Sequence, residues 1–385
     1  MFIDSEDIKR VIPEVIKIRR HIHMYPEISE HEYETSKYIK KCLEEIGLEA
    51  NFIGDTGVVS MLMNNPEFQT VGLRAEMDAL PIEEETNLEF KSKNKGVMHA
   101  CSHDGIVATA LGVTKLLYEH KDELKCNVKF IFEPAEEVGR GAKKLIKEKV
   151  LENPTVDKMV IFHYANSAPI GMEIQKGVST ATLGRVSIEI IGKSSHWGEP
   201  EKGINAISVA AKVIDAIDKI NEDLKEKIQF VLGMGIINGG VKNNIMAENV
   251  KLEGTIRTFC EENLEYVLTY LQDRMKEIEE ETKATIKATL TSHLPALINN
   301  PNLVKMGSKV GKEVFGDKFV LGEKPFLEGD NAAYYFRLVP GVRMVFFAEK
   351  ENEENYPLHN GKFDFNEDIF PYAVCALYNV ISTIE

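Results

Sequence analysis

Several side chains able to bind metal ions or to move protons stand in four short segments of this sequence. Cys101 and His103 lie two positions apart, and Glu136-Glu137 sets two carboxylates side by side on a short polar turn. His163 follows a short apolar run, and His359 lies in a polar loop. Thiolates, imidazoles and carboxylates are the groups with which proteins bind divalent cations such as zinc. These residues therefore predict a metal site assembled from separated segments.

The segments that precede these residues indicate how the chain would bring them together. Short apolar runs at 70–75, 127–132 and 158–162 predict strands, and each ends close to an acidic residue or a histidine. An apolar helix is expected over 105–120, directly after Asp104. Strands that alternate with helices are typical of α/β layers around a mainly parallel sheet. Such sheets keep their sites at the carboxyl ends of the strands, which is where the candidate ligands fall.

The middle of the chain has a different pattern, which predicts an inserted domain. The expected elements are, in order, a strand at 185–192, a helix at 205–221, strands at 229–237 and 250–259, a helix at 262–282 and a strand at 284–290. This βαββαβ order is the split unit of a ferredoxin-like α+β fold. We therefore expect a discontinuous metal-binding α/β domain over 1–182 and 293–385, interrupted by a smaller domain over 183–292.

Composition excludes several classes of function. The 385 residues carry a formal charge of -15, so no basic surplus exists to neutralise nucleic-acid phosphates. No apolar run approaches the roughly 18 residues of a membrane-spanning helix, and the N-terminus lacks the basic and apolar regions of a signal peptide. The five cysteines are odd in number and widely spaced, as in a reducing compartment. We expect a cytoplasmic protein that binds neither nucleic acid nor membrane.

Several short motifs occur in the same order as in a known family, and together they extend over almost the whole chain. They are Arg20–Glu27, Leu73–Pro81, Met98–Gly105, Pro134–Glu137, Gly239-Gly240 with Asn244, Gly254–Phe259 and Leu358–Asn360. On these motifs the sequence resembles the M20 family of metal-dependent amidohydrolases and peptidases, and most of all its branch of N-acyl-amino-acid, hippurate and auxin-conjugate amidohydrolases. The resemblance implies hydrolysis of the amide bond of an N-acyl amino acid or a small peptide.

The same resemblance implies a centre of two divalent metal ions in each chain. Cys101 takes the place that bridges the two ions, and two cations depress a thiol pKa enough to leave a thiolate at neutral pH. The other implied ligands are His103, Glu137, His163 and His359. Zinc or manganese suits this mixed set of sulfur, nitrogen and oxygen ligands, and nickel and cobalt are further candidates. Glu136 is implied to be the general base that takes a proton from the attacking water.

Residues outside the ligand set also acquire roles through the resemblance. His196 of the inserted domain would donate to the tetrahedral oxyanion, from its own subunit or from a partner. Asn244 and Arg257 would bind the carboxylate of the substrate. Asp78 would orient a metal-ligating histidine. Because the inserted domain resembles the dimerisation domain of the family, we expect a homodimer.

The sequence departs from the family pattern at several positions near these motifs. Glu76 stands where an aspartate is usual, Ser102 where a glycine is usual, and Glu133 where a glutamine is usual. Ile106-Val107 replaces a His-Thr pair, and residues 329–332 replace a Ser-Glu-Asp-Phe-like segment, which leaves the role of its acidic residue, Asp330, open. The implied ligands and base are all retained. We therefore expect catalysis to be retained with a different acyl pocket.

Three alternatives to an N-acyl-amino-acid hydrolase remain open from the sequence. Two keep the chemistry and change the substrate: a dipeptidase, or a deacylase of N-acyl-diaminopimelate. The third belongs to another class, a non-catalytic protein that binds a metal or a ligand on the same fold. Replacing Glu136 by alanine distinguishes the classes, because only in a hydrolase would turnover disappear while metal binding is kept.

Overall fold

The computed structural model describes residues 3–384, which divide into two compact units. The first unit comprises the described residues up to Ser179, Ile298–Lys324 and the described residues from Asn331 onward. The second comprises Thr180–Leu297 and Pro325–Asp330. The short return of the chain at Pro325–Asp330 falls inside the segment expected to belong to the α/β domain. It groups with the second unit because the Ala181 N–H donates to the carbonyl oxygens of Phe326 and Glu328, at 3.0 and 2.9 Å.

The first unit is built on an eight-stranded sheet with the order β1-β2-β4-β3-β5-β14-β6-β13. Its strands are β1 (Ala50–Ile53), β2 (Gly57–Leu62), β3 (Thr70–Glu76), β4 (Asn127–Glu133), β5 (Lys158–Ala165), β6 (Gly171–Gln175), β13 (Phe319–Gly322) and β14 (Gly341–Phe347). The central strands β4, β3, β5 and β14 run parallel, and β1 and β2 pair antiparallel with their neighbours. β6 pairs antiparallel with β14 and parallel with β13. The predicted α/β fold with a mainly parallel sheet is confirmed.

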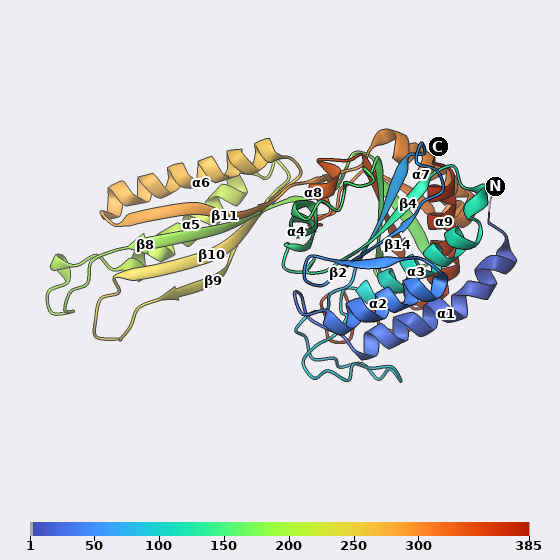
Figure 1. Ribbon diagram of the computed structural model, residues 1–385. Helices are drawn as coiled ribbons and strands as arrows, with labels where there is room; N and C mark the ends of the chain where they lie inside the picture. Colours follow the sequence, from blue (N-terminus) through green and yellow to red (C-terminus); the bar gives the residue numbers. More distant parts are fainter. Residues whose placement is uncertain (1–2, 385) are drawn as a thin grey trace. The chain divides into compact units, whose positions relative to one another are not determined.

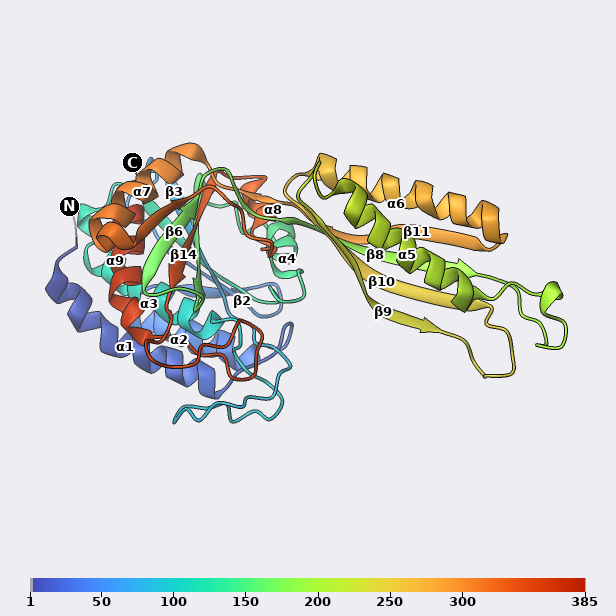
Figure 2. The same ribbon diagram turned by 180° about the vertical axis from the view of Figure 1, so that it is seen from behind.

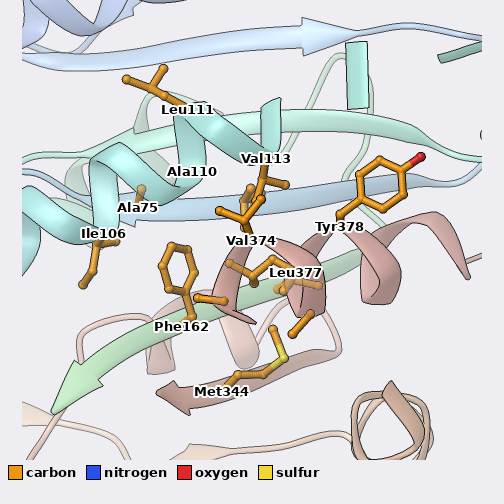
Figure 3. Close-up of a cluster of buried hydrophobic side chains, with 14 of the residues drawn as sticks. Ala75, Ile106, Ala110, Leu111, Val113, Phe162, Met344, Val374, Leu377 and Tyr378 are labelled. Carbon is orange, nitrogen blue, oxygen red and sulfur yellow. The ribbon is translucent and has the colours of Figure 1, made fainter. Parts of the chain in front are cut away.

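Helices on this unit belong to two groups. The helices α1 (Ser5–Met24), α2 (Tyr33–Ile46), α3 (His103–Glu119), α7 (Pro301–Phe315) and α9 (Phe370–Ser382) pack on one another, and α4 (Gly141–Lys147) packs on α8 (Ala333–Phe336). Figure 3 shows Ile106 and Val113 of α3 and Leu377 of α9 gathered with Phe162 of β5 and Met344 of β14. α3 is buried along almost its whole length, which explains its nearly continuous apolar sequence.

The second unit has its own hydrophobic core and the predicted βαββαβ order (Figure 1). Its elements are β8 (Thr182–Ile191), α5 (Ala206–Leu224), β9 (Val231–Gly239), β10 (Asn249–Thr258), α6 (Glu261–Thr282) and β11 (Thr285–Leu294). The sheet order β11-β8-β10-β9 places the fourth strand beside the first and the third between the first and the second, as in ferredoxin-like folds. Both helices cover the same face of this sheet (Figure 2).

A few short elements complete the fold. β7 (Val178–Thr180) and β12 (Leu297–Ile298) form a two-stranded sheet. Single 3-10 turns lie at Lys121–Glu123, Pro200–Lys202, Gly316–Lys318 and Glu367–Ile369. Within residues 3–384 no helix combines the length and the apolar character needed to cross a bilayer.

Candidate metal centre

Three neighbouring strands of the large sheet lead to two of the five candidate ligands, to the candidate base and to Asp78. Strands β4, β3 and β5 are adjacent and parallel. Asp78 follows β3 by two residues, Glu136-Glu137 lies on the turn after β4, and His163 belongs to β5 itself. Parallel strands that end at one edge bring residues distant in the sequence to the same place.

Two further segments complete the cluster. Cys101 precedes the first residue of α3, which is His103, so the thiol and this imidazole stand at the N-terminus of that helix. His359 comes from the segment between β14 and α9, and its backbone N–H donates to the carbonyl oxygen of Ala100 at 2.8 Å. This hydrogen bond fixes the His359 loop beside Cys101, although the two residues are far apart in the chain.

The Cys101 sulfur is the common neighbour of the donors. It lies 3.3 Å from His359 Nε2 and 3.7 Å from His163 Nε2. Glu137 places Oε2 3.5 Å from His359 Nε2 and Oε1 3.9 Å from His103 Nε2. Cys101 forms one close group with His103 and His163 and another with Glu137 and His359, and a third group consists of His103, Glu136 and Glu137. Within each group all donor atoms lie within 4.8 Å of one another, a spacing compatible with shared coordination.

The residues present fit a divalent cation. His103 Nε2 and Glu137 Oε1 are buried, and neither has a hydrogen-bond partner among residues 3–384. Buried polar atoms without partners are costly and rare in folded proteins, and a cation between these two atoms would satisfy both. The His359 side chain is 52% exposed, against 1% for His103 and 7% for Glu137, so the cluster is accessible from the side of His359.

Hydrogen bonds at Nδ1 direct the other ring nitrogens toward the cluster. His103 Nδ1 lies 2.8 Å from the carbonyl oxygen of Asp78, and the carboxylate of the same residue is 3.4 Å away. His163 Nδ1 lies 2.7 Å from the carbonyl oxygen of Tyr164. Asp78 Oδ2 also accepts from the backbone N–H of Glu137, at 3.0 Å. Asp78 therefore contacts two of the donor residues, as partners of metal ligands commonly do.

Three non-glycine residues at the cluster have left-handed backbone conformations. Ser102 has a φ of 64°, Ala135 of 56° and His359 of 65°. Such angles cost free energy in residues with a Cβ and often accompany functional sites. Ser102 occupies the position at which the family pattern has glycine, and its hydroxyl donates to the carbonyl oxygen of Cys101.

Electrostatics around Cys101 favour the protonated thiol when no cation is bound. Burial raises the pKa of Cys101 well above its usual value, and the negative charge of Glu137 adds to the rise. Burial alone would lower the pKa of His103, but the neighbouring Cys101 and Asp78 outweigh it and the net shift is upward. A divalent cation favours thiolate and neutral imidazole instead, so metal binding is expected to release protons.

A buried ion-pair network that the sequence did not predict meets the first turn of α3. Arg19 of α1 donates to Asp104 at 3.1 Å, to Glu367 at 2.9 Å and to Asp364. Asp104 follows His103 in the first turn of α3, so the network anchors the helix end that carries this histidine. Arg19 and His23 are the polar residues on the buried face of α1, a pattern that indicates buried partners without identifying them.

Glu136 also has neighbours that the sequence did not predict. Its Oε1 accepts a hydrogen bond from the backbone N–H of Asn331 at 3.3 Å. The side chain of Asn331 in turn contacts Arg74, a buried cation in the middle of β3. Arg74 follows an apolar stretch of β3, which indicates a paired buried charge, and Glu76 at the end of the same strand is one of its partners.

The remaining predicted site residues all belong to the second unit. His196 forms an isolated β-bridge with Ile245, which places it beside Asn244 in the loop region between β9 and β10. Arg257 lies near the other end of β10, paired with Leu183, and its guanidinium donates to the carbonyl oxygen of Leu327 at 2.8 Å. Asp330 is buried as the last residue of the returning segment.

Comparison with known proteins identifies related sequences and structures. The model of peptidase family M20/M25/M40 matches residues 72–383. N-acetyl-L-cysteine deacetylase of Bacillus subtilis is 34% identical over 351 residues, which cover 89% of this chain and 82% of the relative. Thermostable carboxypeptidase 1 of Saccharolobus solfataricus is 34% identical over 382 residues, which cover 97% of this chain and 95% of the relative.

A solved structure supports the same relationship. The crystal structure of the Bacillus subtilis YxeP protein, described as a dinuclear metal binding peptidase from the M20 family, superposes with a TM-score of 0.84. The two sequences are 28% identical, and the match covers 97% of this chain and 98% of that one. The resemblance stated from the motifs and the expected hydrolase class are confirmed. The chain belongs to peptidase family M20/M25/M40.

Proposed function

We propose that this protein hydrolyses the amide bond of N-acyl amino acids or small peptides, with water as the nucleophile and Glu136 as the general base. The observation that carries the proposal is the cluster of thiol, imidazole and carboxylate donors around Cys101, beside a carboxylate anchored by a backbone N–H. The deacetylase among the relatives supports an N-acyl amino acid as substrate, and the carboxypeptidase supports a peptide.

The donor cluster would hold two divalent ions. Cys101 belongs to two of the close groups, which supports a sulfur shared between the ions. His103, Glu137, His163 and His359 would supply the remaining ligands. Zinc or manganese suits this donor set, and nickel and cobalt stay candidates. When bound, such ions polarise the scissile carbonyl group and make a water molecule more acidic.

The protein's own groups would move the proton and stabilise the developing charge. Glu136 would take a proton from water as the water oxygen attacks the carbonyl carbon. It would then give this proton to the amide nitrogen as the carbon–nitrogen bond breaks, which yields a free amine and a carboxylate. His196 would donate to the oxyanion formed in between. Asp78 would keep His103 oriented through its contacts at Nδ1.

The second unit supports an active site shared between two subunits. Asn244 and His196 lie next to the start of β10 at Asn249, whereas Arg257 lies near the opposite end of this strand. At about 3.3 Å per residue the two ends are roughly 25 Å apart. Asn244 and Arg257 can therefore bind one substrate carboxylate only if they come from different chains. We infer a homodimer in which His196 and Asn244 act in the site of the partner subunit.

The edge of the second sheet offers a surface for this dimer. β9 is an edge strand, and edge strands readily pair with another chain. Ile236 and Ile237 of β9 are 50% and 54% exposed, and Val241 in the following loop is 87% exposed. Exposed apolar side chains next to an unpaired edge favour association of two copies.

The location of the enzyme is part of the same proposal. All five cysteines are free thiols, which suits a reducing compartment. We therefore place the enzyme in the cytoplasm.

Amine release from a panel of N-acyl amino acids and dipeptides tests the activity. The protein is reconstituted with zinc, manganese, cobalt or nickel, and a chelated sample serves as the control. Metal-dependent turnover of one class is the expected result and names the substrate. Glu136→Gln should lower turnover at least about a hundredfold with metal content unchanged. Full activity in that variant would remove Glu136 as the base, and bound metal without turnover of any panel member would favour a non-catalytic binding protein.

Subunit complementation tests the shared site. Neither Glu136→Gln nor His196→Ala should be active alone. Mixed dimers would combine the intact His196 of one chain with the intact Glu136 of the other, so equal amounts of the two variants should recover about a quarter of wild-type activity in a symmetric dimer. A mixture as inactive as its components, with dimers established by light scattering, would place His196 in its own subunit's site.

A further inference from the structure

A buried charge cluster lies next to the proposed general base and has no part in the chemistry described so far. At its centre is Arg74 of β3, which is fully buried. Its guanidinium donates to Glu133 Oε2 at 3.0 Å and to Glu133 Oε1 at 3.1 Å, a bidentate arrangement. It also donates to Glu76 and, at 2.6 Å, to the side-chain oxygen of Asn331.

Asn331 connects this cluster to the base. Its backbone N–H donates to Glu136 Oε1 at 3.3 Å while its side-chain oxygen accepts from Arg74. Asn331 is also where the chain re-enters the first unit, because the preceding residues, Pro325–Asp330, belong to the second unit. The bond to Arg74 thus fixes Asn331 at a point where the chain crosses between units.

Stability alone does not account for such a cluster. Fully buried ion pairs are often no more stabilising than apolar residues of similar size, because desolvation offsets much of the attraction. What a bidentate, buried guanidinium does provide is a fixed direction for its remaining donors. Here one of these donors points to Asn331, the residue that contacts Glu136.

We propose that Arg74, held by Glu133 and Glu76, is a positioning residue that fixes the Glu136 carboxylate through Asn331. This inference rests on the proposed function, in which Glu136 is the base. One oxygen of the Glu136 carboxylate accepts a hydrogen bond from the Asn331 N–H, and the Asn331 side chain is held in turn by its hydrogen bond from Arg74. A base must be held within a fraction of an ångström of its productive position, and misplacement by about 1 Å can cost a hundredfold in rate.

The first test removes the side chain of Asn331 and leaves Arg74 and Glu136 unchanged. Asn331→Ala keeps the backbone N–H but loses the acceptor for Arg74, so kcat should fall about tenfold with KM and metal content unchanged. Asn331→Asp retains an oxygen for Arg74 and should keep kcat within about twofold of wild type. The amide nitrogen that this change removes has no hydrogen-bond partner among residues 3–384, so no contact is lost.

A matched control separates positioning from general destabilisation. Asn299 is also buried, with its side chain accepting from the Arg343 N–H at 2.8 Å and donating to the Gln175 carbonyl oxygen at 2.9 Å. Asn299→Ala should lower the unfolding midpoint at least as much as Asn331→Ala but leave kcat unchanged. Equal losses of kcat in the two variants, or no loss in Asn331→Ala, would overturn the inference.

Crystal structures of the variants provide a readout that does not depend on turnover. In Asn331→Ala the Glu136 side chain should move or become disordered, and in Asn331→Asp it should stay in place. A Glu136 side chain that is unchanged in Asn331→Ala refutes the positioning role even if no substrate has been found. Failure of the wild-type enzyme on the whole substrate panel, with the expected movement of Glu136, would instead count against the proposed function alone.

Discussion

Replacing Arg19 by methionine should destabilise the first unit more than any single surface change. The Arg19 side chain is 2% exposed and faces Asp104, Asp364 and Glu367. Removing one member of a buried charge network leaves the others without compensation, which typically costs about 3–5 kcal/mol. Methionine keeps an apolar contact with Phe365, over whose ring the guanidinium now lies 3.9 Å from the centroid.

The neighbours of Arg19 indicate that the loss of stability lies in the lower part of this range of about 3–5 kcal/mol. Each of the three acids has another partner: His23 for Asp104 at 2.8 Å, Lys350 for Asp364 and Arg20 for Glu367. None of the carboxylates is therefore left wholly unpaired, and we expect a loss of about 3 kcal/mol.

Urea unfolding followed by far-ultraviolet circular dichroism measures this loss, with Arg10→Met as the matched control. Arg10 also pairs with two acids, Asp7 and Glu119, but its side chain is 50% exposed. Exposed pairs contribute at most about 1 kcal/mol, so the control should change little. A cost below about 1 kcal/mol for Arg19→Met, or a cost no larger than that of the control, would refute the stabilising role of the buried network.

Three further predictions concern the site and its support. Cys101→Ala should leave fewer than two metal ions per chain by elemental analysis, because two of the three close groups lose their shared donor, whereas Cys101→Asp should retain two; two ions bound to the alanine variant would exclude a bridging thiolate. Ser102→Gly should raise the unfolding free energy by up to about 1 kcal/mol, since glycine adopts a φ of 64° without strain, and a lower urea midpoint would contradict this. Burial raises the pKa of Asp364, but the neighbouring Arg19 and Lys350 together outweigh it and the net shift is downward. The stabilisation from Asp364 is thus present above its unfolded pKa of about 3.9 and is lost as the pH falls below it. Urea midpoints measured in wild type and in Asp364→Asn between pH 3 and 6 should converge toward the acid end, and a constant difference would refute the linkage.

Local patterns explain why so much of the fold could be predicted from the sequence. The helix α2 ends at Ile46 because the next residue, Gly47, adopts a φ of 105°, a conformation that glycine permits. The βαββαβ order of the second unit follows from alternating and helical periodicities that need no tertiary information. Its sheet order, with β11 beside β8, is a property of the folded chain but is the usual outcome for this order of elements.

The candidate ligands could also be chosen from the sequence, because residue type and spacing determine which groups can bind a cation. The motifs that contain Cys101, His103 and Glu136-Glu137 are short, and each lies next to a strand or helix that the apolar pattern reveals. Because adjacent parallel strands end at the same edge of the sheet, motifs that follow such strands come close together. The sequence by itself therefore determined the family, the fold class and the chemistry of the donor set.

Only the tertiary structure decided which buried charges are partners. Arg19 meets Asp364 across 345 positions and Arg74 meets Asn331 across 257, and no local pattern links residues at such separations. It likewise separated Arg257 from Asn244, two residues that the sequence assigned to one task, because they lie near opposite ends of β10. The physical reason is that periodicity reports which face of an element is buried, whereas the partner of a buried polar group depends on how distant elements pack.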